Sequence, residues 1–84
     1  MQVAKELAEV EVASAMHSRR RIVVLVRDDG NFTYAEQYHH LTEQDGRTLA
    51  EGWVTLPAFG IFASAEAAEA AGREVMDRWL RRAD

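Results

Sequence analysis

Cysteine is absent from this chain, and proline occurs only once. Without cysteine the protein can form neither a disulfide bond nor a thiolate zinc site. The longest apolar run, Ile22 to Val26, is far too short to span a bilayer, and no apolar signal core precedes it. We therefore expect a cytoplasmic protein with no membrane partner.

Basic residues are outnumbered by acidic ones, with 10 Lys and Arg against 14 Asp and Glu and a net charge of −4. This balance favours solubility and opposes a general attraction to nucleic acid or anionic lipid. The one basic run, Arg19 to Arg21, suits the C-terminal end of a helix, where cations are stabilising. A length of 84 residues fits one domain, residues 1–84, with a thin core.

Good helix formers fill the segment from Gln2 to Ser18, which has four Ala, three Glu and no Gly or Pro. Val3, Leu7 and Val10 fall at helical spacing, so this segment is predicted to be an N-terminal helix. The alternation from Glu9 to Val12 would also suit a strand.

Three later segments have the β-branched and aromatic residues or the period-2 alternation of strands. They are separated by Asp29-Gly30, typical of a tight hairpin, and by a turn within Thr42 to Gly46. Pro57 ends the third strand, and a short extended piece follows it. The predicted strands are Arg21 to Asp28, Asn31 to Leu41 and Arg47 to Leu56, with a possible short fourth strand at Gly60 to Phe62.

The end of the chain has the strongest helical pattern. Ser64 is a good N-cap, Glu66 lies in the first turn, and an apolar stripe runs from Ala68 to Leu80. The predicted fold is therefore α+β, a three-stranded antiparallel sheet with an N-terminal and a long C-terminal helix in the order α-β-β-β-α.

Strand pairing suggests a binding surface. A two-residue loop at Asp29-Gly30 places Leu25 opposite Tyr34, and a four-residue second loop places Trp53 opposite Glu36. One face of the sheet is then aliphatic and the other is rich in rings. A large uncovered aromatic face usually marks a binding surface. The predicted binding residues are Arg27, Phe32, Tyr34, Tyr38 and Trp53.

No catalytic or metal-binding pattern is found in the sequence. Neighbours on a strand point to opposite faces, so His39 and His40 cannot hold one metal ion together. None of the serines lies in a nucleophile elbow, and the scattered glycines form no phosphate-binding loop. We expect no enzymatic activity, no metal and no cofactor.

The order helix, three strands, helix resembles that of double-stranded-RNA-binding domains. Those domains place lysines at the start of the last helix, where this chain has Glu66 and Glu69, which would repel phosphate. The segment from Gly60 to Ala68 also resembles the strand-to-helix junction of plant ethylene-response-type DNA-binding domains. More generally, the sequence is similar to short bacterial proteins without an assigned function. These resemblances imply a fold layout and no functional residue.

The predicted function is a small interaction module that self-associates or binds a protein partner through its sheet. A symmetric homodimer would cover an aromatic face that the helices leave open. One alternative is nucleic-acid binding through the aromatic face with Arg21 and Arg27, although the acidic charge argues against a nucleic-acid partner. The other is a small-ligand protein or an enzyme, which needs a cavity near Glu36, His40 or Trp53.

Overall fold

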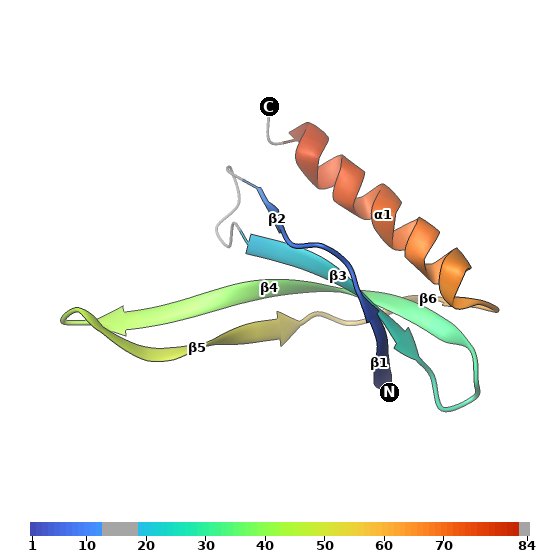
Figure 1. Cartoon of the computed structure of the whole chain (residues 1–84), viewed down its shortest axis with the longest axis horizontal. Helices are drawn as coiled ribbons and strands as arrows, with labels where there is room; N and C mark the ends of the chain where they lie inside the picture. The colour runs from blue at the N-terminus through green and yellow to red at the C-terminus, as the bar shows by residue number, and fades with distance from the viewer. Residues whose placement is uncertain (13–18, 83–84) are drawn as a thin grey trace.

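The computed structural model describes residues 1–12 and 19–82. Over these residues six antiparallel strands form one curled sheet, and a single helix follows them and lies on one face (Figure 1). The elements are β1 (Gln2–Glu6), β2 (Val10–Glu11), β3 (Arg19–Val26), β4 (Phe32–Gln44), β5 (Arg47–Thr55), β6 (Phe59–Phe62) and α1 (Ala65–Arg82).

The predicted α-β-β-β-α layout is wrong because the N-terminal segment is extended up to Val12. Strands β1 and β2 both pair antiparallel with β3 and satisfy the backbone groups along its outer edge. That pairing outweighs the modest intrinsic helix preference of the segment. Residues 13–18 of the predicted helix, which include His17, lie outside the described residues.

The central strands follow the order β1-β3-β4-β5, with β2 beside β3 and β6 beside β4. The strands predicted at Arg21 to Asp28, Asn31 to Leu41 and Arg47 to Leu56 correspond to β3, β4 and β5. The short extended piece predicted near Gly60 corresponds to β6, which pairs with the start of β4.

The first hairpin has a three-residue loop, Asp28 to Gly30, rather than the predicted two-residue loop. The amide of Arg27 donates to the carbonyl of Asn31 at 2.8 Å, and Gly30 has a φ of 85°. This geometry is a turn followed by a left-handed residue, the usual form of a three-residue hairpin loop. The extra loop residue shifts the register by one, so Tyr34 lies opposite Val24 and not Leu25.

The second hairpin has the two-residue loop instead. Asp45 and Gly46 have φ values of 54° and 77°, as both central residues of a type I′ turn require. A bulge then leaves Leu49 without a partner on β4, and Trp53 lies opposite His39 instead of Glu36. The predicted register of this hairpin is therefore wrong, and β4 and β5 extend further from the body than expected.

Alternation along β4 defines two faces of the sheet. The helix face carries Tyr34, Glu36 and their even-numbered neighbours, and the far face carries Ala35, Gln37 and their odd-numbered neighbours. In the directly paired β3, Ile22 and Val24 belong to the helix face and Val23 belongs to the far face. The apolar side chains of β3 are thus buried on both faces, as its sequence predicts.

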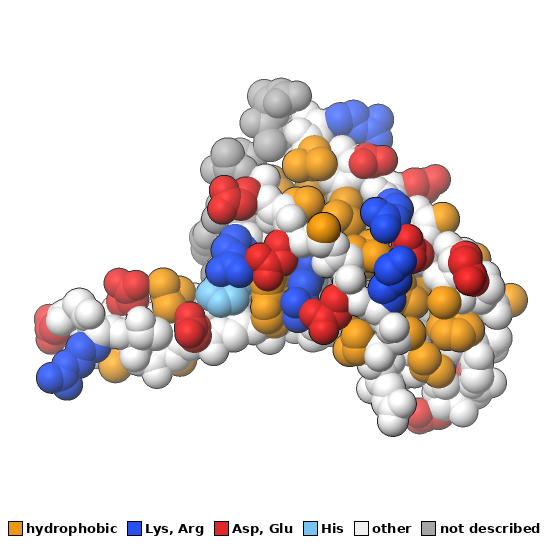
Figure 2. All heavy atoms as spheres, in the orientation of Figure 1, with side chains coloured by type: hydrophobic (Ala, Val, Ile, Leu, Met, Phe, Trp, Pro, Cys, Tyr) orange, Lys and Arg blue, Asp and Glu red, His pale blue; other side chains and the backbone are white. Residues whose placement is uncertain are grey.

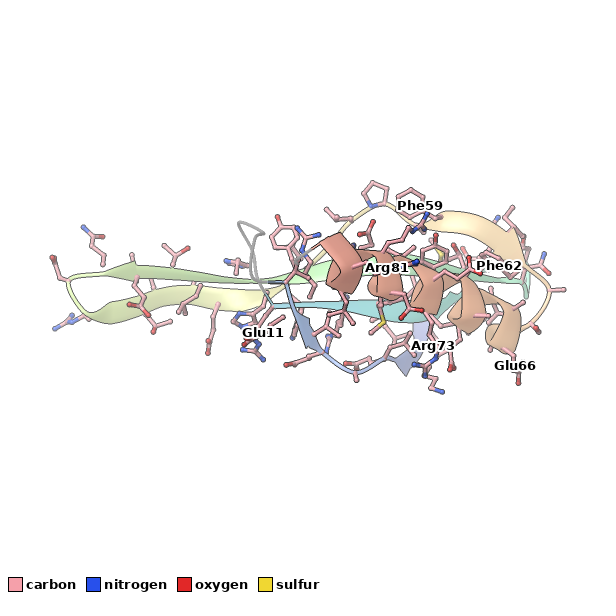
Figure 3. All side chains as sticks on the ribbon, turned by 90° about the horizontal axis from the view of Figure 1, so that it is seen from above. Glu11, Phe59, Phe62, Glu66, Arg73 and Arg81 are labelled. Carbon is pink, nitrogen blue, oxygen red and sulfur yellow. The ribbon has the colours of Figure 1, made fainter. Side chains whose placement is uncertain are left out.

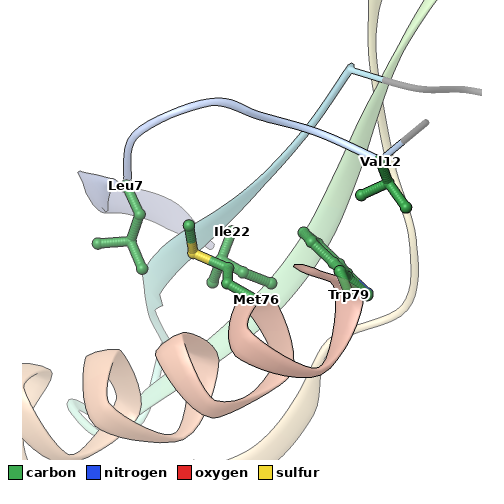
Figure 4. Packing of buried hydrophobic residues seen from close by; sticks show 5 residues of the cluster. All are labelled: Leu7, Val12, Ile22, Met76 and Trp79. Atoms are coloured by element: carbon green, nitrogen blue, oxygen red, sulfur yellow. The ribbon is translucent and has the colours of Figure 1, made fainter. Parts of the chain in front are cut away.

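The main core lies between α1, β3 and the N-terminal segments that follow β1 and β2. Figure 4 shows the side chains of this cluster converging from these segments; they are Leu7, Val12, Ile22, Met76 and Trp79. Most of the apolar stripe predicted for the last helix is buried, including Ala68, Met76 and Trp79, but Leu80 at its end is 46% exposed. Ser64 acts as the predicted N-cap, since its Oγ accepts a hydrogen bond from the amide of Ala67 at 3.1 Å.

The molecule is extended rather than spherical. Its radius of gyration is 14.2 Å, whereas a compact domain of this length has a value of about 12 Å. The difference comes from the outer parts of β4 and β5, which project from the body as a narrow arm (Figure 2). Seen from above, α1 covers only the body of the sheet, and no described element lies over the arm (Figure 3).

Candidate functional site

The arm is a two-stranded ribbon formed by residues 41–51, which we call the ribbon. Each of its residues is solvent-exposed. It carries two leucines, Leu41 and Leu49, whose exposures are 50% and 58%. A two-stranded hairpin by itself is marginally stable in water, because neither of its faces is buried. The ribbon therefore stands to gain stability from a contact that covers one of its faces.

The tip of the ribbon presents a mixed chemical surface on one face. Gln44, Asp45, Arg47 and Leu49 border one shallow depression. Gln44 is an even-numbered residue of β4 and lies opposite Arg47, so this surface belongs to the helix face. The tip thus offers an anion, a cation and an apolar side chain on the same side of the sheet.

Strand β5 also forms an open edge of the sheet. Within the described chain it pairs with β4 and with no other strand. Open edges can recruit further strands, and proteins commonly limit this with charges and bulges. The bulge at Leu49 and the charges of Arg47 and Glu51 fit that role, so the edge is better suited to side-chain contacts than to continued strand pairing.

A second surface feature, which we call the aromatic hollow, lies between α1 and the sheet. It has a volume of about 350 Å³ and is lined by Tyr34, Glu36, Phe59, Val75, Arg78 and Trp79. The rings of Tyr34 and Phe59 are stacked with their centroids 5.8 Å apart. Phe59 remains 47% exposed at the rim, and Figure 3 shows it beside the helix.

Two opposite charges lie on the walls of the aromatic hollow. Glu36 comes from β4, and Arg78 comes from α1. Among the salt bridges formed by the described residues, none involves either side chain. The hollow therefore combines apolar ring walls with one carboxylate and one guanidinium that are available to a partner.

A cluster of polar and aromatic side chains covers the far face. The guanidinium of Arg21 lies 4.1 Å from the ring centre of Trp53, and that of Arg19 lies 5.7 Å from it. His39 meets the same ring edge-on, with a centroid distance of 5.3 Å. Such cation–π contacts contribute to stability at half-buried sites.

The arginines of this cluster are neutralised within the chain. Arg21 forms a salt bridge with Glu6, and Arg19 forms one with Glu9 at 2.8 Å. The Nε of Arg21 also donates to the side-chain oxygen of Gln37 at 2.7 Å. The same face also holds a small buried apolar cluster of Val23, Leu25 and Ala35.

The five predicted binding residues do not share one face. Phe32, Tyr34 and Tyr38 are even-numbered residues of β4 and lie on the helix face, whereas Trp53 is paired with His39 on the far face. Arg27 lies at the first turn, where its Nε donates to Asp29 at 3.2 Å. Of the five, Tyr34 lines the aromatic hollow.

Sequence reasoning missed the ribbon and most of the hollow. The alternation of β4 continues past Leu41 to Gln44, but Thr42 and Glu43 were expected to belong to the turn. The signal for a longer hairpin was Asp45-Gly46 itself, because this pair favours a two-residue loop and therefore longer strands. No local pattern brings Phe59 and Arg78 next to Glu36, since α1 folds back over the sheet.

The described residues contain no group of three His, Cys, Asp or Glu side chains placed to hold a metal ion. Nor does the helix in that part of the chain have the length and apolar character needed to cross a bilayer. Comparison of the chain with known protein families, with curated proteins and with solved structures finds no match.

Proposed function

We propose that this chain is a protein-interaction module that self-associates through its ribbon. The observation that carries the proposal is the ribbon itself, in which every residue is exposed and two leucines are about half exposed, whereas the body of the sheet packs a buried apolar cluster on each face. This differs from the predicted burial of an aromatic sheet face, because α1 occupies the side where the rings of β4 lie.

The charge distribution supports a protein partner over nucleic acid. The alternative required Arg21 and Arg27 to contact phosphate, but these side chains are engaged by Glu6 and Asp29. The ribbon carries Glu43, Asp45 and Glu51 against one Arg47, so it would repel a phosphate backbone. A second copy of the chain provides both charge signs and has no such conflict.

Self-association also fits the energetics of the two leucines. Burying a leucine side chain fully contributes about 1.5–3 kcal/mol. Leu41, an odd-numbered residue of β4, lies on the far face, whereas Leu49 borders the depression on the helix face, so a partner that covers either face buries one half-exposed leucine and gains roughly 1 kcal/mol. In a symmetric dimer each contact occurs twice, which doubles the gain.

Sedimentation equilibrium of the purified chain tests the proposal. The wild type should change from monomer to dimer as its concentration rises into the high micromolar range. The double variant Leu41→Lys/Leu49→Lys should dimerise at least about tenfold more weakly, since roughly 1.4 kcal/mol corresponds to a factor of ten.

Val3→Lys is the matched control, because Val3 is an apolar strand residue of similar exposure, 53%, outside the ribbon. It should dimerise as the wild type does. A wild type that stays monomeric at high micromolar concentration would refute the proposal. So would dimerisation that both variants retain in full.

A further inference from the structure

The ribbon tip and the aromatic hollow have complementary chemistry. The tip presents Leu49 together with Arg47 and Asp45. The hollow presents ring walls together with one carboxylate, Glu36, and one guanidinium, Arg78. The apolar, cationic and anionic groups of the tip therefore match the rings, the carboxylate and the guanidinium of the hollow.

We propose that the occupant of the aromatic hollow is the ribbon tip of a second copy of this chain. This inference rests on the proposed self-association and adds the place where the ribbon docks. Leu49 of one copy packs against the rings in the hollow of the other. Arg47 then pairs with Glu36, and Asp45 pairs with Arg78.

The positions of the two surfaces allow both contacts to form at once. Glu36 and Gln44 are both even-numbered residues of β4, so hollow and tip lie on the same face of the sheet. Eight residues separate them along the strand, a distance of about 26 Å at 3.3 Å per residue. A twofold axis near His40, midway between them, places each tip over the other copy's hollow.

Such a dimer would also fill the open space above the ribbon. In one chain α1 covers the body of the sheet and leaves the ribbon bare (Figure 3). In the face-to-face pair each helix would lie beside the partner's ribbon, so two sheets would enclose two helices. Leu80 on α1, which is 46% exposed, and the rim residue Phe59 would gain cover in this arrangement.

Charge reversal provides the first test, with sedimentation equilibrium as the measurement. Arg47→Glu and Glu36→Arg should each weaken dimerisation by about tenfold or more, because each places like charges together. The double variant Arg47→Glu/Glu36→Arg should recover most of the loss, since the pair is restored with its signs exchanged. Glu51→Arg, a charge reversal on the far face of the same ribbon, should leave dimerisation unchanged.

Disulfide trapping provides a second test that does not depend on the tolerance of Glu36 to substitution. The chain has no cysteine, so introduced thiols report only on each other. Leu49→Cys/Val75→Cys should form a covalent dimer under mild oxidation, because Val75 lines the hollow. Each single variant should remain uncrosslinked.

The outcomes separate this inference from the proposed self-association. If the wild type dimerises but the charge reversals have no effect, the hollow is not the docking site. Crosslinking by Leu49→Cys alone would show that the tips meet each other, which also overturns the inference. A strictly monomeric wild type would instead refute the self-association itself.

Discussion

Replacing Gly72 with alanine tests how closely α1 is packed on the sheet. Gly72 is buried in the helix, and a Cβ atom built there would lie 2.6 Å from Cγ2 of Ile22. Ile22 is completely buried, and Met76 and Trp79 pack in the same cluster. The methyl group can therefore be accommodated only by moving core side chains or the helix.

Two opposing contributions decide the sign of the effect. Alanine is favoured over glycine in a helix interior by about 1 kcal/mol. Overpacking a well-packed core costs about 1–3 kcal/mol. Because the contact is far shorter than van der Waals distance, the steric cost should be the larger contribution and leave a net loss of about 1 kcal/mol. In a domain of this size the melting temperature should then fall by about 4–8 °C.

Thermal unfolding followed by circular dichroism at one fixed protein concentration measures this change. Ala70→Gly at an exposed helix position should lower stability by about 1 kcal/mol through helix preference alone. In the Gly72→Ala background, Ile22→Ala should cost less than it does in the wild type, since it removes the clashing Cγ2. A rise in melting temperature for Gly72→Ala would refute the predicted contact between α1 and β3.

Two further predictions concern the N-terminal cap of α1 and the ion pair that links this helix to β1. Ser64→Ala removes the acceptor for the amide of Ala67 and should cost about 1 kcal/mol in chemical denaturation. Hydrogen bonds from Lys5 and Arg73 lower the pKa of Glu69, so their stabilising effect is complete above the ordinary glutamate pKa and is lost as pH falls through the lowered value. The difference in unfolding free energy between wild type and Lys5→Met should therefore be constant near neutral pH and shrink below about pH 4. A difference that persists unchanged in acid would contradict the stabilising role of the Lys5–Glu69 contact.

Local sequence patterns correctly predicted α1 and β3, because the residues that determine these two elements lie within their own segments. The N-cap Ser64, the first-turn Glu66 and the apolar stripe lie within one segment, and α1 forms where they predict it. The double-sided apolar character of β3 likewise predicted a strand covered on both faces, and Ile22 and Val23 are completely buried.

The conformation of the N-terminal segment and the pairing registers of the strands depend on contacts with other segments, which local sequence patterns do not reveal. Gln2 to Glu6 contains good helix formers, yet it pairs with β3 because the outer edge of that strand needs a partner. The registers depend on loop length, and Asp-Gly suits both a two-residue and a three-residue loop. Asp29-Gly30 and Asp45-Gly46 adopt one form each, and the sequence does not distinguish them.

The candidate site could be predicted only in part for the same reason. Tyr34 was expected to bind a partner and does line the hollow, but its neighbours there come from β6 and α1. A one-residue change of register moves a side chain to the opposite face. Trp53 therefore lies on the far face with Arg21 rather than beside Tyr34.

Hydrogen exchange of the ribbon amides as a function of protein concentration tests the central claim most directly. In a dilute monomer the uncovered ribbon should open easily and exchange fast, as weakly buried segments do. Docking on a second copy should slow exchange across residues 41–51 as concentration rises, while β3 should stay protected at every concentration. Exchange in the ribbon that is equally fast from low to high micromolar concentration would contradict the claim that it is the surface through which this chain associates.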